Sequence, residues 1–265
     1  MDLQLKGKRA VISGGSKGIG LSAARALAAE GVDLVLAARD AEVLAAAAQA
    51  ITAEYGVKAI PVPTDVRDDA AVRALAQRAE DELGGADILV NSASNQQVGA
   101  GHPGLAGTTD ENFYSDIDVK LVGYLRTARA ISPLMIRQGW GRIINISGLG
   151  ARSTLSITRT IRNVSVVALT KNLADELGPH GINVTGVHPG QTRTEPTDHQ
   201  LAQEAARLGV SFEDAERRRA ANILGRLVHA DEIADVIAFL ASPRSVSITG
   251  DFIPVGGGQP GVVYY

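Results

Sequence analysis

A glycine-rich turn near the start of the chain has the composition of a phosphate-binding loop. It follows the apolar run Arg9–Ser13 and leads into a helical pattern, with glycine at four positions between Gly14 and Gly20. Glycine permits positive φ and lets a phosphate approach backbone N–H groups, while the positive end of the following helix favours an anion. After the first strand of a βαβ unit, this pattern is typical of a dinucleotide-binding loop. The residues expected to contact the cofactor are Gly14, Ser16, Lys17, Gly18, Ile19 and Gly20.

The residues at the end of the second predicted strand distinguish between the two nicotinamide cofactors. An acidic residue there would bond the ribose 2′-hydroxyl of NAD and repel a 2′-phosphate. Here the strand ends at Ala37-Ala38-Arg39, the first carboxylate is Asp40, and Lys17 adds a cation from the glycine loop. Because a guanidinium pairs well with phosphate oxygens, the sequence predicts NADP(H) in preference to NAD(H).

Apolar runs that favour strands alternate with helical patterns along the whole chain. Strands that are apolar on both faces and are separated by helices indicate a parallel sheet, and right-handed crossovers then give a doubly wound sheet. We therefore expect one α/β domain of the Rossmann type over residues 1–265, a parallel seven-stranded sheet with helices on both faces. The predicted strands are Arg9–Ser13, Asp33–Ala37, Lys58–Val62, Asp87–Asn91, Arg142–Ser147, Ile182–Val187 and Phe252–Val255. The longer predicted helices are Asp40–Tyr55, Asp68–Leu83, Thr109–Gln138, Thr160–Leu177 and Asp231–Leu240.

Residues 191–221 break this alternation. The segment is polar, rich in Arg and Glu, and separates the sixth predicted strand from the last helix. So long an excursion in a compact α/β domain is typical of a lid or substrate-binding loop. The alternative is a solvated helical insertion that contacts nothing else.

The composition excludes several classes of protein. Of the 265 residues, 45% are hydrophobic and 21% are charged, which provides for a buried core and excludes a disordered chain. The chain has no cysteine, so we expect no disulfide, no cysteine nucleophile and no thiolate metal site. We also predict no metal ligands among the other residues. A net charge of −3 argues against nucleic-acid binding. Since no apolar run has the length of a signal peptide or a membrane span, we expect a cytoplasmic protein without a membrane partner.

Four further motifs occur in a fixed order after the glycine loop: Asp65-Val66, Asn91-Ser92-Ala93-Ser94, Pro189-Gly190 with Thr194, and Val255-Gly256-Gly257-Gly258. Together with the loop they resemble the motifs of the short-chain dehydrogenase/reductase family, with Ser13 where Thr is usual and Asn-Ser-Ala-Ser in place of Asn-Asn-Ala-Gly. The resemblance covers nearly the whole chain and implies a nicotinamide-dependent oxidoreductase that acts on a carbonyl or an alcohol. It also implies cofactor contacts from Asp65, Val66, Asn91, Ala93, Pro189, Gly190 and Thr194.

The resemblance further implies four catalytic positions, and each of them differs in this chain. In the family a Tyr is the acid/base, a Lys four residues later lowers its pKa and holds the ribose, a Ser orients the carbonyl, and an Asn supports a proton relay. Aligned on the following helix, the Tyr position is Arg159 and the Lys position is Asn163. The Ser position is Gly148, next to Ser147, and the Asn position is Lys120. Arginine cannot exchange protons at neutral pH, whereas the amide of Asn163 can still bond a ribose hydroxyl.

Three functions remain open on these residues. The first is an NADP(H)-dependent oxidoreductase whose proton transfer uses Ser147, Lys120 or His188, the last because an ordinary histidine has a pKa of about 6.5. The second is a catalytically silent relative that serves as a cofactor-binding or structural subunit. The third is a non-redox, lyase-type enzyme in which the cations of Lys120 and Arg159 stabilise an oxyanion.

The same two cations indicate the kind of substrate. Lys120 and Arg159 would favour a small molecule with a carboxylate or phosphate, unless each pairs with an acid such as Asp118 or Glu195. The resemblance implies pairing of subunits through the helices Thr109–Gln138 and Thr160–Leu177. We therefore expect a homo-oligomer, either a dimer or a tetramer, or a hetero-oligomer with an active homologue.

Overall fold

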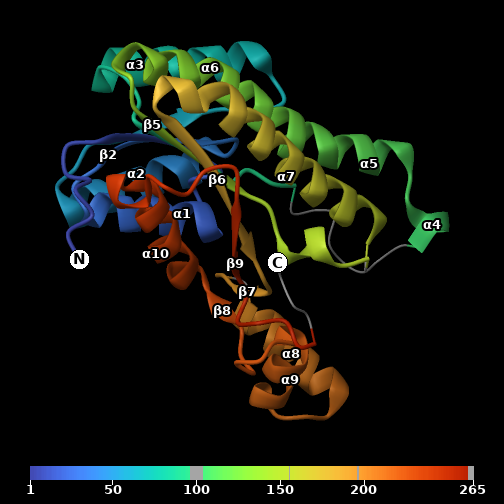
Figure 1. The fold of residues 1–265 in the computed structure, drawn as a ribbon. Coiled ribbons are helices and arrows are strands. Elements are labelled where there is room, and N and C mark those ends of the chain that lie inside the picture. The colour runs from blue at the N-terminus through green and yellow to red at the C-terminus, as the bar shows by residue number, and fades with distance from the viewer. Residues whose placement is uncertain (96–103, 155, 196, 262–265) are drawn as a thin grey trace.

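A seven-stranded parallel sheet forms the centre of the protein. The computed structural model describes residues 1–95, 104–154, 156–195 and 197–261. The strands lie in the order β3-β2-β1-β4-β5-β6-β9 (Figure 1), which confirms the predicted doubly wound sheet. Their bounds are β1 (Arg9–Ser13), β2 (Asp33–Ala38), β3 (Ala59–Pro63), β4 (Ile88–Asn91), β5 (Gly141–Ile146), β6 (Ile182–Pro189) and β9 (Phe252–Val255).

Helices cover both faces of this sheet, as predicted. One hydrophobic cluster joins one face to α1, α2 and α10, and a second cluster joins the other face to α3, α6 and α7 (Figure 1). Asp40 and Asp68 cap the first turns of α2 and α3, and Gly56 and Gly84 end these helices at φ of 70° and 75°. The bounds are α1 (Gly18–Ala29), α2 (Ala41–Tyr55), α3 (Asp69–Leu83), α4 (Gly104–Gly107), α7 (Ile157–Leu177) and α10 (Ala230–Ala241).

The prediction of a single helix over Thr109–Gln138 is wrong in one respect. The structure divides it into α5 (Asp110–Ile117) and α6 (Gly123–Gln138), joined by a π-helical turn at Asp118–Val122. Hydrophobic periodicity does not reveal this turn, because helix continues on both sides of it. Such turns are frequent at functional sites, and this one carries Lys120.

Residues 191–221 form short helices that project beyond the sheet (Figure 1). β7 (Thr192–Arg193) pairs in parallel with β8 (Val228–His229), and between them lie α8 (Thr197–Leu208) and α9 (Phe212–Ala220). Leu201, Ala220 and Leu227 give this segment a small core of its own. No helix in the described ranges is long and apolar enough to cross a membrane.

Candidate functional site

A cleft of about 740 Å³ lies at the carboxyl ends of the parallel strands. Ligands of open α/β sheets bind at this edge. Of the predicted cofactor residues, those that line the cleft are Gly14, Ser16, Lys17, Gly18, Ile19, Arg39, Asp65, Val66, Ala93, Pro189, Gly190 and Thr194. Gly20, Asn91 and Asn163 do not line it. Of the catalytic candidates, Lys120 and Ser147 line the cleft, and Arg159 and His188 do not.

The glycine loop packs too closely against its neighbours for side chains. Gly14 has a φ of 73°, and a Cβ there would lie 2.8 Å from the backbone nitrogen of Ala93. A Cβ on Gly20 would collide with the carbonyl of Gly14. Asn91 ends β4, where its Nδ2 donates to Asn145 and its Oδ1 accepts from Thr127. Gly20 therefore shapes the loop and Asn91 joins β4 to β5 and α6, and neither residue lines the cleft.

The N-terminus of α1 binds the carboxylate of a glutamate side chain. The backbone N–H of Gly18, the first residue of α1, donates to Oε1 of Glu195 at 3.0 Å. A carboxylate at this point is what the positive end of a helix favours. The loop geometry and this contact together fit the diphosphate of a dinucleotide.

The charges at the end of β2 fit the predicted cofactor preference. The carboxylate of Asp40 accepts from the N–H of Val43 as the cap of α2, while the exposed Arg39 and Lys17 line the cleft. Asp65 accepts from Arg67 through both carboxylate oxygens, and this bonding lowers the pKa of Asp65. Arg39 and Lys17 thus line the cleft together with Asp65, whose pKa the charge of Arg39 also lowers.

Lys120 provides an amine at the inner end of the cleft. Its side chain is buried, with 5% of the residue exposed, and Nζ donates to the carbonyl oxygen of Ser147 at 2.7 Å. Burial lowers the pKa of Lys120 well below its ordinary value, and the nearby Arg162 lowers it further while Asp116 opposes the shift. An amine with a lowered pKa exchanges protons more readily near neutral pH.

Arg162 and Asp116 form a buried ion pair that the sequence analysis missed. Nη1 of Arg162 donates to both carboxylate oxygens of Asp116 at 2.7 and 2.8 Å. The side chain of Asp116 is fully buried and that of Arg162 is 11% exposed. Of the predicted acidic partners, Asp118 pairs with Arg126 and Glu195 contacts the N–H of Gly18.

Ser147, Gly148 and Asn163 pack together beside Lys120. The hydroxyl of Ser147 donates to the carbonyl oxygen of Asn163 at 3.1 Å. A Cβ on Gly148 would lie 3.1 Å from Nδ2 of Asn163, so a side chain here would crowd that amide. Asn163 is 4% exposed, and its Oδ1 has no hydrogen-bond partner among the described residues.

Arg159 and His188 lie near this group but outside the lining of the cleft. Arg159 is in the first turn of α7, where its charge also lowers the pKa of Lys120. His188 stacks on Phe252 with ring centroids 4.4 Å apart. Burial, assisted by the nearby cations, lowers the pKa of His188 to about 4. His188 is therefore neutral at neutral pH, contrary to the titration near neutrality that its residue type predicts.

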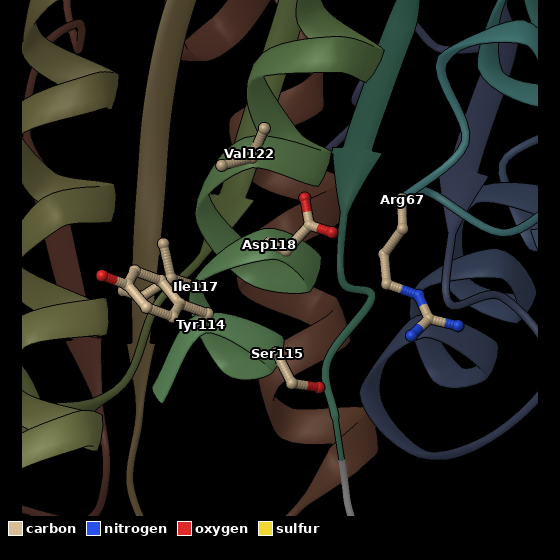
Figure 2. A pocket seen from close by; sticks show the side chains of 6 residues that line it. All are labelled: Arg67, Tyr114, Ser115, Ile117, Asp118 and Val122. Atoms are coloured by element: carbon tan, nitrogen blue, oxygen red, sulfur yellow. The ribbon is translucent and has the colours of Figure 1, made fainter. Parts of the chain in front are cut away.

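A second hollow of about 410 Å³ is lined by α5, the π-helical turn and Arg67 (Figure 2). Its charged groups are already paired, Arg67 with Asp65 and Asp118 with Arg126. Tyr114, at 66% exposure, forms one wall. None of the predicted catalytic residues lines this hollow. In the described parts of the chain, no cluster of three or more metal-ligating side chains occurs either.

Comparison with known proteins places the chain in a family. A family model described as Enoyl-(Acyl carrier protein) reductase matches residues 14–259. The short-chain reductase protein NovJ of Streptomyces niveus is 35% identical over 253 residues, covering 95% of this chain and 93% of that protein. The chain belongs to the short-chain dehydrogenase/reductase family. This family of oxidoreductases is the one predicted from the motifs.

Two solved structures of family members carry cofactors. L-sorbose reductase from Gluconobacter frateurii, complexed with NADPH and L-sorbose, superimposes with a TM-score of 0.91 at 28% identity, over 99% of this chain and 100% of its own. An NAD+-bound xylitol dehydrogenase superimposes with a TM-score of 0.86 at 26% identity, over 96% of this chain and 100% of its own. Short-chain dehydrogenase/reductase neighbours of this chain thus bind both nicotinamide cofactors.

Proposed function

We propose that this short-chain dehydrogenase/reductase is an NADP(H)-dependent oxidoreductase that interconverts a carbonyl and an alcohol, with Lys120 exchanging the proton. The observation that carries the proposal is the buried amine of Lys120 in the cofactor cleft, held 2.7 Å from the carbonyl oxygen of Ser147. Tyrosine normally performs this role in the family, and the described part of the cleft lining includes none.

Lys120 has the properties that the step requires. When bound, NADP(H) would supply or accept the hydride. The carbonyl of Ser147 orients the amine, and Nζ carries the proton that a substrate oxygen takes up on reduction. A lowered pKa favours this transfer, since an ordinary lysine would hold its proton too tightly near neutral pH. Ser147 also lines the cleft, where its hydroxyl can bond the substrate oxygen after leaving Asn163.

The preference for NADP(H) rests on Arg39 and Lys17. Both cations line the cleft, the carboxylate of Asp40 is engaged as a helix cap, and that of Asp65 is bonded to Arg67. The NADPH complex of L-sorbose reductase supports the same choice, whereas the NAD+ complex of xylitol dehydrogenase shows that the fold accepts either cofactor. Equal affinity for NADPH and NADH in fluorescence titrations would refute this preference.

The surroundings of Lys120 favour an anionic substrate in a cytoplasmic enzyme. Arg159 and Arg162 both contribute positive potential at the amine, and Asp116 offsets only part of it. A carboxylated or phosphorylated carbonyl compound suits such a recess. In this proposal the segment of residues 191–221, which contacts the glycine loop through Glu195, closes over the bound substrate.

Exposed apolar side chains support an oligomer. Leu125 and Ile136 on α6 and Ile161 and Val164 on α7 are each between 38% and 47% exposed. Isolated apolar side chains are common on surfaces, but four on two neighbouring helices favour a subunit interface. Light scattering that finds a monomer at micromolar concentration would refute this part.

The activity is tested by following NADPH oxidation with a panel of neutral and anionic carbonyl compounds. Substituting Lys120→Met or Lys120→Arg should lower kcat by about 10²- to 10⁴-fold, because neither side chain exchanges a proton near neutral pH. The matched control is Lys58→Met, an exposed lysine outside the cleft. Turnover by Lys120→Met at the wild-type rate would refute the role of Lys120.

The second candidate is a silent family member, favoured by the predicted changes at the four catalytic positions. It predicts that the protein binds NADPH but reduces no compound of the panel, and that it co-purifies with an active homologue. Turnover without any change in NADPH absorbance would instead support the non-redox lyase.

A further inference from the structure

Glu195 contacts the first residue of α1, where the glycine loop predicts that the diphosphate of a dinucleotide binds. Its carboxylate accepts the N–H of Gly18 at 3.0 Å, at the beginning of α1. Gly18 itself lines the cofactor cleft. The first N–H groups of a helix have no partner within the helix and bind phosphates readily. A carboxylate and a diphosphate cannot share this N–H, and they repel each other.

The backbone around Glu195 belongs to the segment that projects beyond the sheet. The N–H of Thr194 donates to Oγ1 of Thr197 at 2.8 Å, and the N–H of Thr197 donates to the carbonyl of Thr194 at 2.9 Å. Arg193 of β7 pairs with Asp198 of α8 at 2.6 Å. The contact of Glu195 with Gly18 therefore fastens β7 and α8 to the glycine loop.

We propose that Glu195 is an internal competitor of the cofactor diphosphate, so that NADP(H) binds only when this carboxylate leaves Gly18. The inference rests on the cofactor binding proposed above and adds a residue that sets the affinity. Departure of the carboxylate also removes one tie between this segment and the glycine loop, beside which Thr194 remains. Cofactor binding and movement of the segment are thereby coupled through the contact of Glu195 with Gly18.

Fluorescence titration with NADPH tests the competition. Glu195→Ala removes the competing carboxylate and should tighten binding by about three- to tenfold, a modest gain because the side chain is exposed. The gain should shrink as the salt concentration rises. The matched control is Glu213→Ala, which makes the same charge change at an exposed position of α9 and should bind within about twofold of the wild type. Unchanged or weaker binding by Glu195→Ala overturns the inference.

Amide exchange in the cofactor-free protein tests the contact separately. With isotope-labelled glycine, the Gly18 N–H should exchange faster in Glu195→Ala than in the wild type, and at the wild-type rate in Glu213→Ala. Equal exchange in all three proteins overturns the contact whatever binds. If exchange changes as expected but no variant binds NADPH or NADH, the cofactor assignment fails and the competition fails with it. If the wild type binds NADPH and only the affinity gain is missing, the competition alone fails.

Discussion

Replacing Asp116 with asparagine should destabilise the protein strongly. The carboxylate of Asp116 is fully buried and accepts two hydrogen bonds from Arg162, whose side chain is 11% exposed. Asp116→Asn leaves a buried guanidinium without a counter-charge, and breaking such a pair costs about 3–5 kcal/mol. Since a domain's whole free energy of unfolding is about 5–15 kcal/mol, this loss is a large fraction of the total.

Urea denaturation followed by circular dichroism measures this loss. The matched control is Asp175→Asn, which breaks the exposed pair with Lys171 and should cost less than about 1 kcal/mol. A double replacement, Asp116→Leu with Arg162→Met, removes both charges and should return to within about 1 kcal/mol of the wild type or exceed it. If Asp116→Asn costs no more than the control, the ion pair does not have the energetic role assigned to it.

The same substitution should move the pH dependence of the reaction. Asp116 raises the pKa of Lys120 and Arg162 lowers it, so removing the carboxylate lowers this pKa further. Reduction needs the protonated amine, and its rate falls as pH rises through the pKa of Lys120. In Asp116→Asn this fall should begin at a lower pH than in the wild type. A profile unchanged or moved to higher pH would contradict proton transfer by Lys120.

Three further outcomes are expected. The pKa of Lys120 is lower in the folded protein than in the unfolded chain, so at a pH between these two pKa values the folded state binds fewer protons. In thermal unfolding, the stability of the wild type should therefore rise with pH relative to that of Lys120→Met. If the stabilities of the two proteins change with pH in parallel, the lowered pKa is contradicted. Gly148→Ser places a Cβ 3.1 Å from Nδ2 of Asn163 and should cost about 1–3 kcal/mol in urea denaturation, with recovery when Asn163→Ala is added. Arg39→Glu should weaken NADPH binding by about tenfold or more while sparing NADH; equal losses for both cofactors in titrations would dismiss Arg39 as the determinant.

Much of the fold could be predicted because its signals are local. The buried strands are visible in the sequence as short apolar runs. The beginnings of α2 and α3 are marked by Asp40 and Asp68, and their ends by Gly56 and Gly84. The cofactor cleft was predictable for a similar reason, since the carboxyl ends of parallel strands meet at one edge of the sheet. Most of the predicted cofactor residues therefore lie on the cleft that the structure forms.

The features that the sequence did not reveal depend on contacts between distant segments. Asp116 and Arg162 are 46 residues apart, and neither residue type alone indicates a buried pair. Glu195 and Gly18 are 177 residues apart, and a glutamate in a polar segment reads as a solvated charge. The π-helical turn at Asp118–Val122 changes the direction of Lys120 without changing the helical pattern.

Most of the residues at the predicted catalytic positions pack against one another. Lys120 bonds the carbonyl of Ser147, whose hydroxyl bonds the carbonyl of Asn163. The missing side chains of Gly148 and Gly150 leave room for the amide of Asn163, since a Cβ at either position would lie 3.1 or 3.0 Å from its Nδ2. A larger residue at position 163 therefore requires this loop to move, and a side chain at position 148 requires the amide to move. Installing a serine at position 148 or a lysine at position 163 alone should thus disturb the other position.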